Sequence, residues 1–201
     1  MSRVLEVEAV SVAIEHPIGP YTVEEWLALP PSVDGSNVEL ILGYLHVTPP
    51  PHGSHQWAST NLLVLLRTAL RAAGKDDLYV VHGVGVELST AWRTALIPDL
   101  VVLNVRPDAV SFSPDELELV VEIWSPGHNR AERETKLAAY AGAGVPHVWT
   151  VERNKLGALA VAALRLDNGR YTVDTEINSG ETKTITAAPV PVEVSPSDLA
   201  V

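Results

Sequence analysis

The sequence predicts an α+β or mixed α/β fold in which a central mixed β-sheet is flanked by two main helices, with added β-hairpins. Strand-like segments both precede and follow helical ones, hairpin patterns lie toward both ends of the chain, and two segments dense in Val, Ile and Leu resemble central strands. At 201 residues, 46% of them hydrophobic, the chain can bury one core and is short for two. We therefore expect a single domain over residues 22–194, an N-terminal arm over 1–21 and a C-terminal tail over 195–201.

The first predicted elements are a short helix and a hairpin. Thr22 followed by Glu25 has the pattern of a capping box, which predicts a helix through about residue 29. The segment 37–49, NVELILGYLHVTP, contains two extended runs about Gly43 and predicts a β-hairpin. A proline-rich loop then separates this hairpin from the next helix.

The middle of the chain is predicted to supply the longest helix and the central strands. Apolar residues recur at helical spacing over 55–73, and Gly74 stands in the usual stop position. Strand-like runs follow at 78–88, 96–104 and 116–124. The last two are rich in β-branched and aliphatic residues, as central strands tend to be.

A second helix and a further hairpin complete the predicted fold. Asn129 with Glu132 is typical of the N-terminal cap of a helix over 130–141. The run 147–152 predicts a strand, and 158–177 predicts a hairpin that turns through Asp-Asn-Gly. The proline-rich C-terminus predicts short edge strands and a loose end.

Composition limits the classes of function. A formal net charge of −11 argues against a tight, non-specific DNA binder, because DNA affinity depends on neutralising phosphates. It leaves open a nuclease whose acidic site is neutralised by a divalent metal. The chain has no cysteine, so any metal must be held by oxygen or imidazole. With no bilayer-length apolar stretch and no signal-peptide pattern, we expect a soluble, cytoplasmic protein with no membrane partner.

Acidic residues interrupt the two most apolar strand-like runs. Asp99 lies within LIPDLVVLN and Glu122 within LELVVEIW, and burying an ionised carboxylate is costly unless a cation, metal or hydrogen bonds compensate it. Carboxylate oxygens are what Mg²⁺ selects, and Mg²⁺ can activate water and stabilise charge in phosphodiester hydrolysis. The backbone carbonyl of Ile123 is a candidate further ligand. Lys136, on the following helix, is a candidate to orient the water or to offset charge on the scissile phosphate.

Each of these residues also has an ordinary structural explanation. An acid after proline at a strand edge, such as Asp99, is more often a turn or cap group. Glu122 can form a salt bridge to a nearby Arg or Lys, and Lys136 can be a solvated residue paired with Glu132 at i−4. A glycosidase that uses Glu122 and Asp99 as its two carboxylates is a further hypothesis, but it leaves the helical lysine without a role.

The order of motifs along the chain is more specific than any one of them. The motifs are Glu39-Leu40 with Gly43, Pro98-Asp99, Val120-Val121-Glu122 with Ser125-Pro126, Glu132-Arg133 before Lys136, Tyr140, Gly144-Val145-Pro146, and Trp149. Together they resemble the PD-(D/E)XK nuclease superfamily, and within it the Uma2 family of restriction endonuclease-like proteins. The resemblance runs from about residue 22 to 194.

The resemblance implies a restriction endonuclease-like core and a Mg²⁺-dependent endonuclease, with Mn²⁺ as a substitute ion, that hydrolyses phosphodiester bonds in DNA. It implies Asp99, Glu122 and Lys136 as catalytic residues, with Glu39 as a third metal ligand beside the two acids. In the superfamily the lysine usually lies two residues after the acid. Trp124 holds that position here, so Lys136 is implied to take over from the helix. Glu39 can equally be a salt-bridge partner.

The resemblance also suggests residues on the substrate side. His55 stands where the family commonly has a histidine, and it can bind phosphate, help to position water or be an ordinary surface residue. Arg133 and Tyr140 belong to the matched motifs and are candidate substrate-binding residues. Nucleases of this superfamily commonly dimerise, so a homodimer is an expectation. The alternative to an enzyme is a catalytically inactive binding or assembly module in which the carboxylates survive as a structural network.

The tryptophans are scattered along the sequence rather than regularly spaced. We expect Trp26, Trp57 and Trp149 in the core, and Trp124 as a wall of the acidic site.

Overall fold

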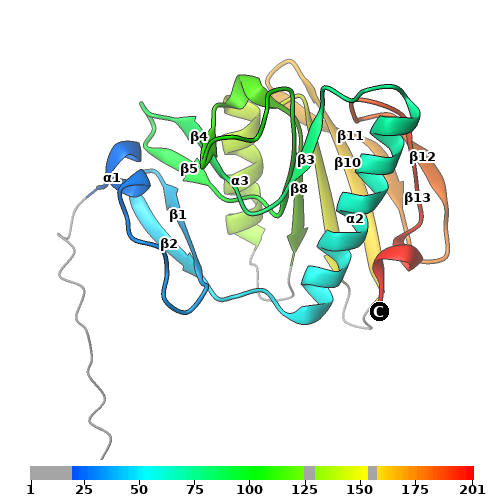
Figure 1. The fold of residues 1–201 in the computed structure, drawn as a ribbon, viewed down its shortest axis with the longest axis horizontal. Coiled ribbons are helices and arrows are strands. Elements are labelled where there is room, and N and C mark those ends of the chain that lie inside the picture. Colours follow the sequence, from blue (N-terminus) through cyan, green and yellow to red (C-terminus); the bar gives the residue numbers. More distant parts are fainter. Residues whose placement is uncertain (1–19, 125–129, 154–157) are drawn as a thin grey trace, which may run out of the picture.

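The computed structural model describes residues 20–124, 130–153 and 158–201 (Figure 1). Its helices are α1 (Val23–Leu27), α2 (Gly53–Ala72) and α3 (Arg130–Gly142), with 3-10 turns at Pro114–Glu116 and Pro196–Leu199. Its strands are β1 (Asn37–Ile41), β2 (Tyr44–Thr48), β3 (Tyr79–Val81), β4 (Gly85–Ser89), β5 (Thr94–Leu96), β6 (Leu100–Leu103), β7 (Ser111–Phe112), β8 (Leu117–Trp124), β9 (His147–Arg153), β10 (Leu159–Asp167), β11 (Arg170–Ile177), β12 (Lys183–Ile185) and β13 (Val192–Val194).

The central sheet has six strands in the order β11-β10-β9-β8-β6-β3. β8 and β9 pair in parallel, and the other neighbours pair antiparallel, so the sheet is mixed. A second sheet of five strands has the order β2-β1-β5-β4-β7. The predicted α+β fold, a mixed sheet with two main helices and added hairpins, is confirmed.

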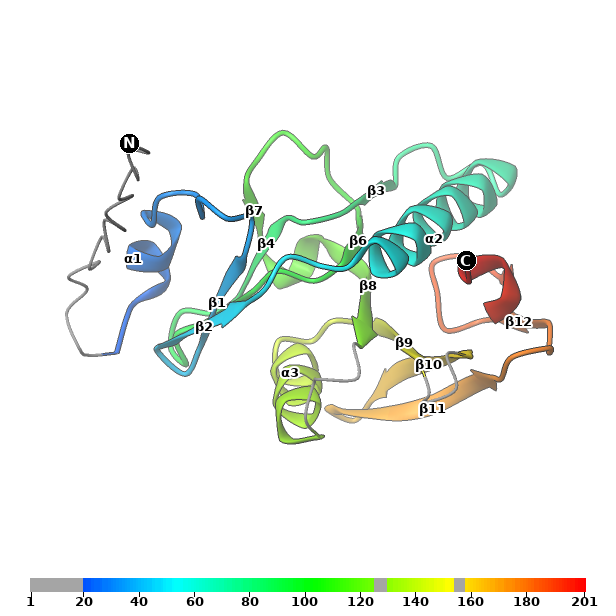
Figure 2. The same ribbon diagram turned by 90° about the horizontal axis from the view of Figure 1, so that it is seen from below.

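The two main helices cover opposite faces of the six-stranded sheet (Figure 2). Leu100 and Val102 of β6 join the core cluster that contains the buried row of α2, whereas Val101 and Leu103 join the cluster that contains Tyr140 of α3. This alternation follows from the two-residue period of a strand. Both faces of β6 and of most of β8 are buried, and these strands are dense in Leu, Val and Ile as central strands are, although Glu118 and Glu122 interrupt β8.

The β1–β2 hairpin positions the first acidic residue of the site. Gly43 has a φ of +86°, and a Cβ there would lie 2.8 Å from the Cβ of Pro20. The turn therefore requires glycine on both counts. The predicted capping box of α1 is present, with Thr22 and Glu25 bonding each other's backbone. Trp26 of this helix packs under the hairpin and donates from Nε1 to the Val38 carbonyl at 2.7 Å.

The predicted strand over 96–104 is split in two. Leu96 ends β5 in the second sheet, and Leu100 begins β6 in the central sheet. Pro98 stands between them and has no amide hydrogen to donate to a ladder, which favours a break at this point. The break is important for the site because it places Asp99 outside both strands.

Two further expectations are wrong. Trp57 is 51% exposed instead of lying in the core, because α2 buries the row that begins at Ala58. The C-terminus is not a loose end: residues 196–199 form a 3-10 turn whose Leu199 is buried against the α2 side of the core. The Asn129 cap, the Ser125-Pro126 motif and most of the predicted arm lie outside the described residues. None of the described helices combines the length and apolar content that crossing a bilayer requires.

Candidate functional site

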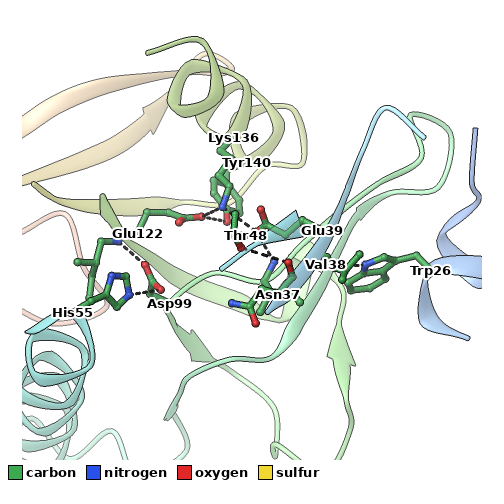
Figure 3. Close-up of polar contacts among 12 residues, drawn as sticks. Trp26, Asn37, Val38, Glu39, Thr48, His55, Asp99, Glu122, Lys136 and Tyr140 are labelled. Atoms are coloured by element: carbon green, nitrogen blue, oxygen red, sulfur yellow. Dashed lines mark hydrogen bonds and ion pairs between the residues drawn. The ribbon is translucent and has the colours of Figure 1, made fainter. Parts of the chain in front are cut away.

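The predicted site residues come from both sheets and both main helices (Figure 3). All of them except Arg133 and Tyr140 line a pocket of about 530 Å³. Its lining includes Glu39 of β1, His55 of α2, Asp99 between β5 and β6, Glu122, Ile123 and Trp124 of β8, and Lys136 of α3. The fold therefore brings together residues that are up to 97 positions apart in the sequence.

The inner part of the site is a buried group that we call the acidic cluster: Glu39, Glu122, Lys136 and Tyr140. Lys136 Nζ donates to Glu39 Oε1 at 2.9 Å and contacts Glu122 Oε1 at 3.5 Å. The Tyr140 hydroxyl donates to Glu122 Oε1 at 2.6 Å. The backbone amide of Ile97 donates to Glu39 Oε1 at 3.0 Å. Two carboxylates thus share one ammonium group in the interior.

Burial of this cluster is nearly complete. Glu39, Glu122 and Lys136 are only 2%, 3% and 4% exposed. The ordinary explanation of Lys136, a solvated residue paired along its own helix, is therefore wrong. The spacing of α3 explains the arrangement, because residues 136 and 140 lie on one face of the helix and both point toward Glu122 of the adjacent strand.

The electrostatics reflect this burial. Desolvation raises the pKa of Glu122 to about 7, although the nearby Lys136 ammonium lowers it. Desolvation alone would lower the pKa of Lys136, but the carboxylates of Glu122 and Glu39 outweigh it, and this pKa is raised. Desolvation and the charge of Glu122 raise the pKa of Tyr140. Lys136 therefore carries a charge at neutral pH, while Glu122 exchanges its proton near neutrality.

Asp99 has its hydrogen-bond partners outside the acidic cluster. Its Oδ1 lies 2.7 Å from His55 Nε2, and its Oδ2 accepts the backbone amide of Ile123 at 2.7 Å. The side chain is partly exposed and lies between α2 and β8, as Figure 3 shows. Both oxygens of this carboxylate thus have protein donors.

One buried oxygen of the cluster lacks a donor. Among the described residues, Glu39 Oε2 has no hydrogen-bond partner. A buried acceptor of this kind is costly unless a cation or water satisfies it, and carboxylate oxygens are the donors that Mg²⁺ prefers. The residue chemistry therefore fits a divalent metal. Within residues 20–124, 130–153 and 158–201, however, no three His, Asp or Glu side chains lie close enough together to hold one.

The two predicted substrate-binding residues of α3 do not line the pocket. Arg133 Nη1 lies 2.5 Å from Glu152 Oε1, and its guanidinium stands 5.6 Å from the centre of the Trp124 ring. Tyr140 is completely buried behind Glu122. A side chain buried in this way cannot contact a substrate, so the predicted substrate-binding role of Tyr140 is wrong. Trp124 itself lines the pocket, as expected.

The sequence did not identify several other lining residues. These are Asn37, Thr48, Pro49, Pro50, Pro51, His52, Ser54, Ala58, Ile97, Glu132, Arg153 and Leu159. The parallel pairing of β8 and β9 brings the end of β9 beside Glu122, and only a known topology could indicate that. A second pocket of about 390 Å³ shares His55 and Asp99 with the first and extends to His82.

Comparisons with known proteins agree with this description. A family model described as "Uma2: Putative restriction endonuclease" matches residues 23–199. Among solved structures, a putative nuclease belonging to DUF820 from Anabaena variabilis ATCC 29413 is similar, with a TM-score of 0.65 and 18% sequence identity. The similarity covers 90% of this chain and 97% of that chain, and at this identity it shows the fold alone. A search of curated proteins finds no match.

Proposed function

The chain belongs to the Uma2 family of putative restriction endonucleases, and on this premise we propose that it is a metal-dependent endonuclease that hydrolyses phosphodiester bonds in DNA. The observation that supports this most strongly is the acidic cluster. Two buried carboxylates, one of them with an unpartnered oxygen, lie beside a charged lysine on the wall of a pocket that also contains Asp99. Buried charge of this kind is typical of functional sites.

The residues proposed to hold Mg²⁺, or Mn²⁺ in its place, are Glu39, Asp99 and Glu122, with the backbone carbonyl of Ile123 as a further candidate. When bound, the ion would supply a Lewis acid and lower the pKa of water near it. Carboxylates of an octahedral Mg²⁺ site must be ionised, so Glu122 has to lose its proton. Its pKa of about 7 permits this at mildly alkaline pH.

Lys136 is proposed as the catalytic cation. Hydrolysis adds water to the phosphorus and breaks the bond to the leaving oxygen, and negative charge builds on the phosphate as this happens. A charged ammonium fixed in a desolvated position stabilises such charge more strongly than one in water. Lys136 is fixed by Glu39 and by Glu122.

Tyr140 and Arg133 are proposed to position residues that line the pocket without contacting the substrate themselves. The Tyr140 hydroxyl donates to the same Glu122 oxygen that Lys136 contacts, so two donors from one helix orient that carboxylate. The Arg133 guanidinium lies against the Trp124 ring, which lines the pocket. Fixing a reacting geometry in this way contributes to catalysis through orientation.

A catalytically inactive binding or assembly module is the second candidate. The observation that favours it is that Lys136 already compensates Glu39 and Glu122 without a metal. On this hypothesis the acidic cluster is structural, and the pocket binds neither Mg²⁺ nor Mn²⁺. A cytoplasmic location and a homodimer remain predictions under either hypothesis.

Cleavage of DNA tests the proposed function. Purified protein is incubated with plasmid DNA and with single-stranded DNA, in Mg²⁺, in Mn²⁺ and in EDTA. The variant is Asp99→Asn, which keeps the shape of a partly exposed side chain, and Asp108→Asn on an exposed loop is the matched control. We expect metal-dependent cleavage that falls by at least about 100-fold in Asp99→Asn and is unchanged in Asp108→Asn.

Two results would decide against the enzyme. Equal cleavage by wild type and Asp99→Asn would show that the cleavage does not depend on the proposed site. Absence of cleavage together with absence of metal binding by wild type would favour the inactive module.

A further inference from the structure

The pocket that contains the acidic cluster extends around the end of β8 to the α2 side of the central sheet. Its lining there includes Ala58, Ile123 and Leu159, which belong to the core cluster that contains the buried row of α2. Arg153, the last residue of β9, also lines the pocket and lies directly opposite Leu159 in the pairing of β9 with β10. Residues opposite each other share a face of the sheet. We call these four residues the Arg153 subsite, an apolar floor with one cation.

Cations are few in this pocket. Among the described residues that line it, Lys136 and Arg153 are the only lysine and arginine, against four carboxylates from Glu39, Asp99, Glu122 and Glu132. Lys136 is 4% exposed, and its ammonium group contacts two of these carboxylates. Arg153 is partly exposed at the end of its strand. A polyanionic ligand that enters from solvent therefore meets Arg153 as the more accessible of the two cations.

The backbone of Arg153 is displaced along the sheet from the acidic cluster. Thr150 of β9 lies opposite Glu122 of β8, and Arg153 is three residues further along β9. At about 3.3 Å per residue in a parallel strand, its Cα lies about 10 Å past the level of Glu122. This displacement favours a phosphate that neighbours the reacting one over the reacting phosphate itself.

We infer that the Arg153 subsite binds the nucleotide next to the scissile phosphodiester and that Arg153 binds the phosphate of that nucleotide. This rests on the proposed endonuclease function and names the part of the same site that holds the substrate. A planar guanidinium presents paired N–H donors that match phosphate oxygens. The apolar floor packs against the sugar and base, as apolar linings with a few polar groups do in ligand pockets.

A purely structural role for Arg153 would have different consequences. In that role the guanidinium only offsets the carboxylates of the pocket, so removing it would change the free energy of unfolding and leave the number of bound phosphates unchanged. A phosphate contact instead releases counterions. Each such contact contributes about 0.7 to the slope of log affinity against log salt concentration for single-stranded DNA. Loss of one contact therefore makes the slope shallower by that amount.

Three variants separate charge, geometry and position. Arg153→Gln removes the charge and keeps a polar side chain. Arg153→Lys keeps the charge without the forked donors, so it should keep the wild-type salt slope and bind DNA more tightly than Arg153→Gln. Arg170→Gln makes the same change in charge at an exposed residue of β11 and is the matched control.

The experiment is a fluorescence anisotropy titration of a labelled single-stranded DNA oligonucleotide with the full chain, in EDTA and in Ca²⁺, at several NaCl concentrations. Thermal unfolding first establishes that each variant is folded, and Arg153→Met replaces Arg153→Gln if the glutamine variant is not. At low salt we expect a dissociation constant about tenfold higher for Arg153→Gln, because a hydrogen bond to a charged group contributes at least that factor. Its salt slope should be shallower by about 0.7, and Arg170→Gln should match wild type.

Steady-state cleavage in Mg²⁺ provides a second measurement. A neighbouring phosphate is bound equally in the ground state and in the transition state, so Arg153→Gln should raise KM and leave kcat unchanged.

Unchanged affinity and salt slope in folded Arg153→Gln, with binding by wild type, would overturn the inference and leave the proposed function intact. A fall in kcat at unchanged KM would also overturn it, because Arg153 would then act on the reacting phosphate. An equal loss in Arg170→Gln would overturn it by showing an effect of net charge. Absence of oligonucleotide binding by wild type in both EDTA and Ca²⁺ would overturn both the inference and the proposed DNA substrate.

Discussion

Two polar networks on the six-stranded sheet differ in how deeply their charged side chains are buried and in the ratio of cations to carboxylates. The acidic cluster is centred on Glu122 of β8 and is enclosed by α3 and the second sheet. The other, which we call the Arg165 network, comprises Arg165 of β10, Asp174 of β11, His147 of β9 and Thr186, which follows β12. Arg165 donates to the Thr186 carbonyl at 2.8 Å and contacts Asp174 at 3.4 Å and His147 at 3.2 Å.

The networks differ in exposure and in charge balance. The side chain of Arg165 is 43% exposed and pairs one guanidinium with one carboxylate. The acidic cluster is almost wholly buried and pairs one ammonium with two carboxylates. Exposed ion pairs contribute about 0–1 kcal/mol, and a buried ion pair is often no more stabilising than apolar residues of similar volume. The Arg165 network costs little desolvation and needs no special explanation, whereas burying three charged groups is costly and stability gives little reason for the acidic cluster.

Removing the cation from each network should give the largest difference in the free energy of unfolding. Lys136→Met leaves Glu39 and Glu122 without their shared ammonium, and breaking a buried pair in this way costs about 3–5 kcal/mol. Arg165→Met is the matched change at the surface and should cost no more than about 1 kcal/mol. Urea unfolding at pH 7 without metal measures both free energies of unfolding.

The same pair of variants tests the link to metal. If the acidic cluster binds Mg²⁺, the ion should replace part of the lost positive charge and raise the melting temperature of Lys136→Met more than that of Arg165→Met. Similar costs for the two substitutions would show that burial does not separate the networks.

A second test uses pH and Glu122. Desolvation raises its pKa to about 7 from an ordinary value of 4.5, so the folded protein binds this proton more tightly than the unfolded chain. The resulting stabilisation is fully present below pH 4.5 and is lost as pH rises through about 7. Glu122→Gln cannot ionise and does not lose this contribution. As pH rises from 4.5 to 8, the free energy of unfolding of wild type should therefore fall relative to that of Glu122→Gln by up to roughly 3 kcal/mol.

Urea unfolding at half-unit pH intervals measures this gain. Glu193→Gln, an exposed change on β13, is the control for loss of one carboxylate and should show a much smaller change with pH. A flat difference between Glu122→Gln and wild type would mean that Lys136 holds Glu122 ionised throughout this range.

Much of the fold was predictable because its elements have strong local patterns. The capping box of α1, the Gly43 hairpin, the α2 periodicity and the apolar runs of β6 and β8 are all local signals, and the structure confirms them. β5 and β7, with three and two residues, are too short to show a period. Their pairing depends on the second sheet, which no local pattern indicates.

The site was predictable in its residues more than in its contacts. Asp99 and Glu122 were indicated by charge in apolar strands, whereas Glu39 and the role of Lys136 depended on family resemblance. Glu39 and Lys136 are 97 residues apart, so their contact follows from packing of the second sheet against α3. The hydrogen bond of His55 to Asp99, across 44 residues, likewise follows from tertiary structure.

The smallest expected change in the free energy of unfolding concerns Asp174 of the Arg165 network. Desolvation alone would raise the pKa of Asp174, but hydrogen bonds from Thr175, Thr186 and Arg165 outweigh it, and the pKa is lowered. Asp174 therefore stabilises the fold above its ordinary pKa of 3.8 and loses this contribution as pH falls through the lowered value. Asp174→Asn should cost less than about 1 kcal/mol at pH 7, and 1 M NaCl should remove most of that cost by screening.

Lys136→Met should keep its cost in the same salt, because buried charges are screened far less. Urea unfolding of both variants at low and high salt measures the contrast, and an equal response to salt would mean that solvent reaches the acidic cluster as freely as the Arg165 network.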